Sequence, residues 1–117
     1  MSSVETLGSI FAVALMLNVM WEFLHARLYV TSVTRTYLVW QSVKDAIWIT
    51  LAYLIAPTVV VFALVLIAFA YVVELHAIHT KRWEYAKEMP RIFGVGLSPL
   101  FELALTGLLT LYLLGLW

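Results

Sequence analysis

Residues 18–25 read NVMWEFLH and close a run that begins at Leu7 and is otherwise almost entirely apolar. At helical spacing Asn18, Glu22 and His25 fall at i, i+4 and i+7, so they share one face of the expected helix. A carboxylate inside a hydrophobic segment costs roughly 2.5–3.5 kcal/mol on membrane-insertion scales. Glu22 should therefore point into a protein interior and meet a polar partner there.

Three further acidic residues, Asp45, Glu74 and Glu102, each interrupt another apolar run. Four expected helices thus each carry one carboxylate, and counting from the helix ends places all four at a similar level. Several carboxylates close together in a low-dielectric interior cannot all be ionised. The cluster must hold protons, pair with a nearby cation such as Lys44 or Arg27, or bind a metal ion.

The composition predicts an integral membrane protein. Of the 117 residues, 64% are apolar and only 12% are charged, with a mean hydropathy of +0.98, far outside the range of soluble globular domains. The length indicates a single domain covering residues 1–117. The absence of cysteine excludes disulfides and thiolate metal sites, and a net charge of zero gives no reason to expect nucleic acid as a partner.

The apolar runs predict an all-α bundle of four transmembrane helices, over about residues 7–28, 37–55, 57–79 and 93–117. The first run lacks a positive n-region and a cleavage site, so we expect a retained span and not a signal peptide. Residues 56–58, Ala-Pro-Thr, are the expected turn between the second and third helices; the alternative is one long kinked helix. Gly94, Gly96 and Pro99 predict an irregular start to the fourth helix.

The positive charges indicate the topology. All seven lie at or near the first and third loops: Arg27, Arg35, Lys44, Lys81, Arg82, Lys87 and Arg91. By the positive-inside rule this side is cytoplasmic, so both termini are expected on the non-cytoplasmic side of the cell (inner) membrane.

Residues 74–102 carry a resemblance to a known family. An acid, Glu74, closes the third apolar run, the following loop reads RWEY at residues 82–85, and the next helix opens with GVGLSPLFE at residues 94–102. This resembles the repeated half of the small membrane-embedded lycopene cyclases of bacteria, archaea and fungi, in which a Pro followed by paired acids opens a helix. The chain is also similar to uncharacterised small bacterial membrane proteins that have Trp-Glu in the first span and an Arg-Trp-x-Tyr loop.

The chain departs from the cyclase pattern in two ways. Phe101 stands where the family has the other acid of the pair, which leaves Glu102 alone. The cyclase combines two such halves, whereas this chain has one, so the resemblance implies a homodimer or a partner subunit.

The first functional hypothesis is a site for an isoprenoid or other lipid-like ligand, transformed by cyclisation or isomerisation without redox chemistry or a cofactor. A buried neutral acid, Glu102 or Glu22, would protonate an alkene, and Glu74 would take a proton from the resulting cation. Trp21 and Tyr71 would stabilise that cation with their aromatic faces. The residues expected to surround the substrate are Asn18, Trp21, His25, Asp45, Tyr71, Trp83, Tyr85 and Pro99.

Two other hypotheses stay open. Glu22 and His25 match the i, i+3 ligand pair of carboxylate-bridged metal sites in four-helix bundles, and Asp45, Glu74 and Glu102 could supply the remaining oxygen ligands for iron or manganese. A second Glu-x-x-His pair is missing, because His76 and His79 follow Glu74 at other spacings. The third hypothesis is a small non-catalytic membrane subunit, in which the acids only hold helices together.

Overall fold

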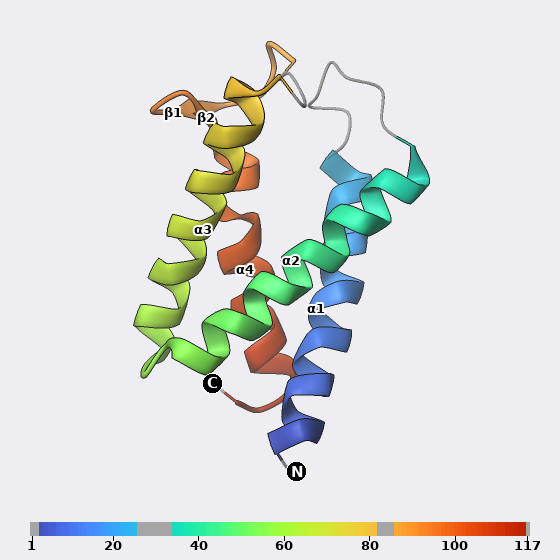
Figure 1. Ribbon diagram of the computed structural model, residues 1–117, viewed down its shortest axis with the longest axis vertical. Coiled ribbons are helices and arrows are strands. Elements are labelled where there is room, and N and C mark those ends of the chain that lie inside the picture. The colour runs from blue at the N-terminus through green and yellow to red at the C-terminus, as the bar shows by residue number, and fades with distance from the viewer. Residues whose placement is uncertain (1–2, 26–33, 82–85, 117) are drawn as a thin grey trace.

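The structure is a computed structural model that describes residues 3–25, 34–81 and 86–116. Within these ranges the chain is all-α, as the sequence predicts. The helices are α1 (Ser3–His25), α2 (Arg35–Ile55), α3 (Val59–His79) and α4 (Leu97–Leu113). A short antiparallel hairpin of β1 (Arg91–Ile92) and β2 (Val95–Gly96) precedes α4 (Figure 1).

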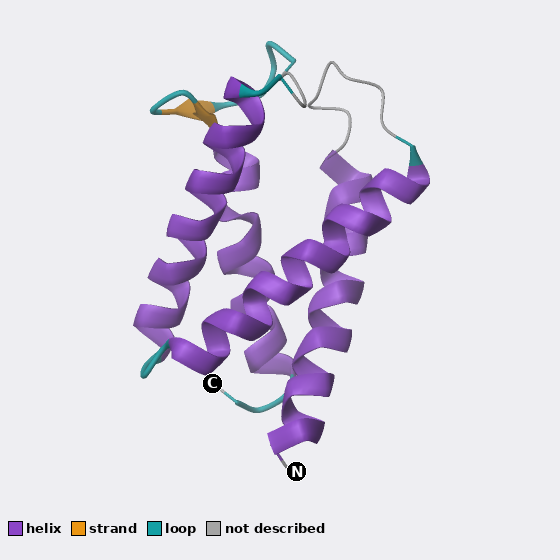
Figure 2. Cartoon of the chain, in the orientation of Figure 1, coloured by secondary structure: helices purple, strands orange, loops and turns teal. Residues whose placement is uncertain are grey.

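The helices alternate in direction, and the two ends of the chain lie at the same end of the molecule (Figure 1). Helix α1 packs against α2 and α4, and α3 packs against α4. Helix α2 runs obliquely across the front of the molecule in this view, from the top of α1 to the foot of α3 (Figure 2). The hairpin lies at the end opposite the two termini, beside the last turn of α3.

Two of the described helices are long and apolar enough to cross a membrane by length and composition. These segments are Ser3–Leu24 and Val59–His79. Helix α4 is apolar but shorter, at 17 residues, and α2 is interrupted by Gln41, Lys44 and Asp45.

The expected turn between α2 and α3 is confirmed, and the two helices are separate. Ala56 has an extended backbone, as a residue before proline prefers. The third helix begins at Val59, two residues later than Pro57, because Thr58 acts as its N-cap. The Thr58 hydroxyl accepts a hydrogen bond from the backbone N–H of Val61 at 3.2 Å, which satisfies one free donor of the first turn.

The fourth helix begins at Leu97 and not at residue 93, because a tight turn precedes it. Phe93 (φ 50°) and Gly94 (φ 79°) both have left-handed backbones, as the two central residues of a type I′ hairpin turn require. Pro99 follows in the first turn of α4, where the missing N–H costs no hydrogen bond. The irregular start that the glycines and Pro99 predict is therefore confirmed, in the form of a hairpin.

The other end of α4 stops at a glycine cap. Gly115 has a φ of 69°, and the backbone N–H of Leu116 donates to the carbonyl of Leu111 at 2.8 Å. The N–H of Gly115 also donates to the carbonyl of Tyr112 at 3.1 Å. These two bonds form a Schellman motif, so the helix ends at Leu113, four residues before the predicted boundary. The first helix is already formed at Ser3, four residues before the predicted start at residue 7, and the predicted end at residues 26–28 lies outside the described chain.

The core is built from one stripe of each helix. On α3, Phe62, Leu66 and Ala70 recur every four residues and are buried. Gly107 of α4 lies directly against this stripe, since a Cβ added there would lie 2.6 Å from Leu66 Cδ1 and 3.1 Å from Phe62 Cε1. A glycine at this position lets the backbones of α3 and α4 approach closely, as small residues do between apolar helices.

This contact predicts that Gly107→Val destabilises the fold, by about 1–3 kcal/mol for overpacking. Gly8→Val is the matched control, because it also replaces a helical glycine, and a Cβ there meets no atom within 4 Å. Thermal unfolding of both variants in the same detergent checks the prediction. Equal midpoints for the two variants would contradict a close α3–α4 contact at Gly107.

Candidate functional site

Three of the four acids that interrupt the apolar runs meet in the structure. Glu22 comes from α1, Asp45 from α2 and Glu102 from α4, and one carboxylate oxygen of each lies within 4.8 Å of the other two. Glu102 is only 4% exposed, whereas Glu22 and Asp45 are partly buried. Carboxyl groups from two other helices are therefore the polar partners of Glu22 that the sequence predicts inside the protein.

The helical stripes that form the core also bring the acids together. On α1 the buried positions Ile10, Ala14 and Asn18 recur every four residues, and Glu22 is the next position in this series. On α4 the buried residues Glu102, Thr106 and Thr110 follow the same rule. Each acid thus takes a place that an apolar side chain would take in an ordinary core.

The carboxyl groups are in direct polar contact. Asp45 shares side-chain hydrogen bonds with both Glu22 and Glu102. An ionised carboxylate only accepts hydrogen bonds, so a bond between two carboxyl groups requires a proton on one of them. With this arrangement, the hydrogen bonds among the three carboxyl groups require at least one proton in the cluster.

Glu74 lies near this cluster on the opposite wall of a pocket of about 50 Å³. It is 7% exposed and continues the buried stripe of α3 after Ala70. The pocket has space for a few water molecules or for the end of a hydrocarbon chain. Its walls are formed by all four helices: Glu22, Tyr37, Leu38, Gln41, Asp45, Trp48, Ala70, Val73, Glu74, Pro99, Glu102 and Leu103.

A second polar layer lies one helical turn from the acids, between α1 and α4. Asn18 is fully buried, and its Nδ2 donates to Thr106 Oγ1 at 3.1 Å and to the carbonyl of Ala14 at 2.8 Å. The Thr106 hydroxyl donates to the carbonyl of Glu102 at 2.8 Å. Because Asn18 and Thr106 are each four residues from an acid of the cluster, this contact sets the register in which Glu22 faces Glu102.

The structure places the remaining sequence-predicted residues as follows. Asp45 and Pro99 line the pocket with the three proposed catalytic acids, whereas Asn18 lies in the layer beside it. Tyr71 points away toward the hairpin, where its hydroxyl donates to the carbonyl of Phe93 at 3.5 Å. Trp21 is partly buried on α1 and is not among the lining residues. His25 is the last residue of α1, but its side chain, like Trp83 and Tyr85, lies outside the described part of the chain.

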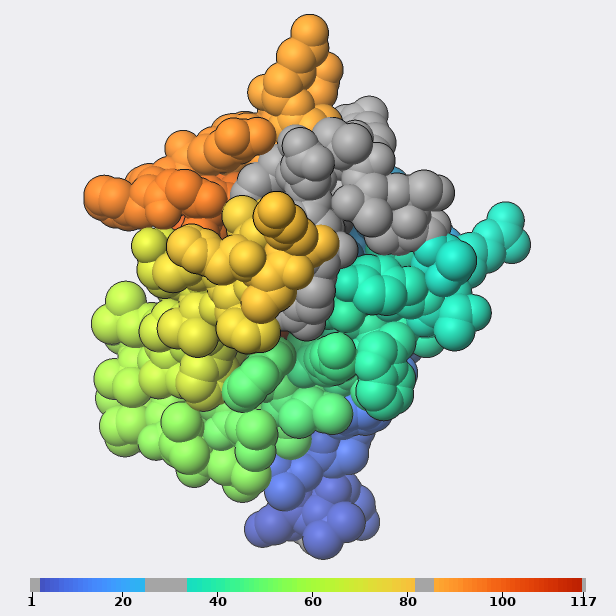
Figure 3. Space-filling view, turned by 45° about the horizontal axis from the view of Figure 1, so that its top comes forward, coloured from blue at the N-terminus to red at the C-terminus, as the bar shows by residue number. Residues whose placement is uncertain are grey.

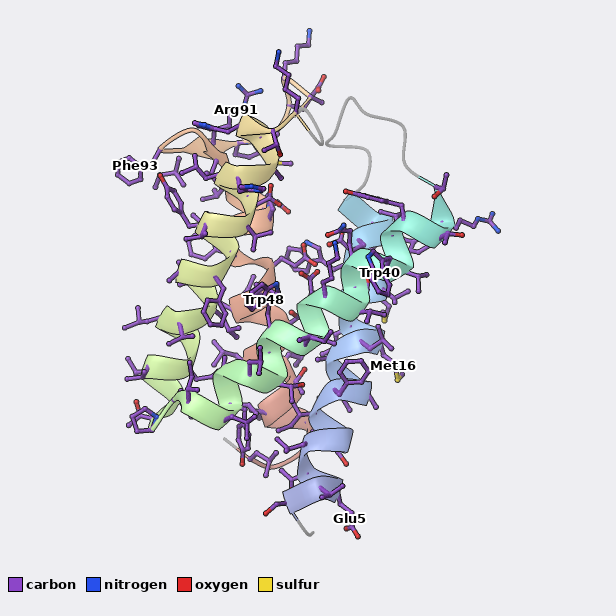
Figure 4. All side chains as sticks on the ribbon, viewed as in Figure 1. Glu5, Met16, Trp40, Trp48, Arg91 and Phe93 are labelled. Atoms are coloured by element: carbon purple, nitrogen blue, oxygen red, sulfur yellow. The ribbon has the colours of Figure 1, made fainter. Side chains whose placement is uncertain are left out.

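Sequence reasoning missed the aromatic wall of the pocket. Tyr37 and Trp48 both line it, and the Trp48 ring packs on Phe69 of α3 with centroids 4.9 Å apart. Trp48 projects from α2 toward α3, whereas Trp40 projects elsewhere on α2 and is exposed (Figure 4). The signal was present, because Tyr37, Gln41, Asp45 and Trp48 follow one another at spacings of four, four and three residues, on one face of a helix.

Comparison of the chain with protein-family models, with curated proteins and with solved structures finds no match.

The hydrogen bonds of Asp45 predict an infrared absorption from protonated carboxyl groups in the folded protein at neutral pH. Asp45→Asn removes the carboxyl group that contacts the other two, so we expect this band to weaken and to shift. Glu88→Gln, an exposed acid outside the site, should leave the band unchanged. A wild-type spectrum without the band would contradict the shared proton.

Proposed function

We propose that this protein spans the membrane as a bundle of four helices, with both termini on the non-cytoplasmic side. Three observations support this placement. Only 17% of the apolar stretch in α1, and 22% of that in α3, is buried inside the protein. The core helix of a soluble protein, by contrast, is mostly buried. Both chain ends lie at one end of the molecule (Figure 1), and three of the five described cations, Lys81, Lys87 and Arg91, belong to the connection and hairpin at the other end. In this placement the protein is located in the cell (inner) membrane.

Helix α1 belongs to this bundle in our proposal and is not a removable signal. It contributes Glu22 to the acidic cluster and Asn18 to the buried contact with Thr106. Removal of α1 would leave Thr106, Asp45 and Glu102 facing a gap.

We further propose that the pocket is an acid–base site for a hydrophobic, isoprenoid-like substrate that enters from the bilayer. The observation that carries this proposal is the convergence of Glu22, Asp45 and Glu102 beside a pocket whose other walls are largely apolar and aromatic. A carboxylic acid that keeps its proton in such surroundings can donate it to an alkene. The chemistry matches the cyclisation or isomerisation that the family resemblance implies.

In the proposed reaction, Glu102 or Glu22 gives its proton to one carbon of a double bond, which forms a C–H bond and leaves a carbocation. Glu74, across the pocket, then takes a proton from a neighbouring carbon, and the electron pair of that C–H bond forms the new double bond. No oxidant, reductant or cofactor is required. Trp48 and Tyr37 line the pocket and would stabilise the cation, in place of Trp21 and Tyr71.

This proposal predicts that Glu102→Gln abolishes turnover while the protein stays folded, because the amide cannot supply the proton. Proton transfer by a positioned group contributes about 10²–10⁴-fold to a rate, so we expect at least about a 100-fold loss. The assay is chromatography of the carotenoids and related isoprenoids of a producing host that expresses either the wild type or the variant. Glu88→Gln is the control, and unchanged products with the Glu102 variant would overturn the assignment.

A metal site is the second candidate, and the spacing of the carboxylate oxygens favours it. One oxygen each from Glu22, Asp45 and Glu102 lies close enough to the others to bind one cation, and such oxygen ligands suit manganese or iron. Of the oxygen ligands that the sequence suggested, this set includes Glu22, Asp45 and Glu102 but not Glu74. Mass spectrometry for lipids and metals on protein purified in mild detergent separates the two candidates. A bound isoprenoid without a transition metal supports the acid–base site, and near-stoichiometric iron or manganese supports the metal site.

A further inference from the structure

The hairpin between α3 and α4 presents an aromatic side chain outward. Phe93 is 83% exposed and its neighbour Ile92 is 39% exposed. Figure 4 shows Phe93 at the edge of the molecule, pointing sideways from the helices. In the space-filling view the hairpin segment, coloured orange, protrudes from the body of the protein (Figure 3).

The backbone that carries Phe93 is fixed in an unfavourable conformation. Its φ of 50° lies in the left-handed region, where hairpin turns of this type favour Asn or Gly. The base of the hairpin is anchored, because Val95 is fully buried and the N–H of Leu97 donates to the carbonyl of Pro90 at 2.6 Å. A rigid turn thus holds a large apolar side chain where the fold gives it little cover, although a smaller residue would suit the backbone better.

Basic side chains accompany Phe93 at this end of the molecule. Arg91 begins the same hairpin, and Figure 4 shows it nearer the end of the molecule than Phe93. Lys81 and Lys87 are exposed in the connection that leads to the hairpin, against one exposed acid, Glu88, among the described residues 80–96. An apolar hairpin tip at Phe93 with basic residues near it is complementary to a membrane interface that contains anionic lipids.

We propose that the hairpin 91–96 is a membrane-interface anchor. Phe93 and Ile92 insert at the boundary between headgroups and acyl chains, and Arg91 of the same hairpin contacts the phosphates of anionic lipids. Because the anchor belongs to the segment that opens α4, it fixes the depth of Glu102 in the bilayer. The proposal rests on the membrane placement above but not on the acid–base chemistry.

Site-directed spin labelling tests the anchor, since the chain has no native cysteine. The variants Phe93→Cys, Val72→Cys and Lys87→Cys are each labelled with a nitroxide and reconstituted in nanodiscs of zwitterionic lipid, with or without phosphatidylglycerol. Collision with oxygen and with a water-soluble nickel chelate reports the depth of each label. Val72 is 65% exposed on α3 and reports the hydrocarbon region, whereas Lys87 reports water.

We expect the label at position 93 to be shielded from the chelate almost as well as the label at position 72, and to lie deeper when phosphatidylglycerol is present. Adding Arg91→Gln to the Phe93→Cys variant should weaken that dependence on anionic lipid. A label at position 93 as accessible to the chelate as that at position 87, with position 72 still in hydrocarbon, would overturn the anchor alone.

Two other outcomes would also overturn the anchor. A label at position 72 in water would overturn the membrane placement together with the anchor. Strong dipolar broadening between labels at position 93 would show that a second copy of the chain, and not lipid, covers the hairpin.

Discussion

The cost of a charge in apolar surroundings governs this structure. Glu22, Asp45 and Glu102 lie on helices rich in apolar residues, and in the proposed membrane placement none of them could face hydrocarbon without a large penalty. They avoid that penalty by turning inward and hydrogen bonding to one another. This requirement selects the rotation of α1, α2 and α4 about their axes, because each helix must direct its acid to the same point.

The buried contact between Asn18 and Thr106 adds a second constraint to the same pair of helices. Polar contacts of this kind between helices in a membrane average about 0.6 kcal/mol, so in the proposed membrane placement this contact would contribute more to register than to stability. A shift of α4 by one turn would break the Asn18–Thr106 bond and separate Glu22 from Glu102 at the same time. Gly107 lies about 100° around α4 from Thr106, where it lets Phe62 and Leu66 of α3 pack closely.

The proposed function and the proposed anchor use different parts of one segment. Residues 91–102 begin with the exposed hairpin, pass through the buried Val95 and Pro99, and end at Glu102 in the pocket. In the proposed function a hydrophobic substrate would reach the pocket from the bilayer, so the depth of the acids relative to the lipid headgroups would matter to the chemistry. An anchor in the same segment would set that depth.

The sequence by itself determined the all-α class, the number of helices in the described chain and the position of the α2–α3 turn, because apolar periodicity and Pro57 act locally. It also identified the acids, since a carboxylate in an apolar run is costly in any fold. Only the tertiary structure decided that Asp45 joins Glu22 and Glu102 while Glu74 lines the opposite wall, because helix rotation and tilt depend on packing between segments far apart in the chain. The same reason explains why Trp48 and Tyr37 line the pocket while Tyr71 contacts the hairpin. The hairpin itself depends on left-handed backbones at Phe93 and Gly94, and a phenylalanine gives no local signal for that conformation.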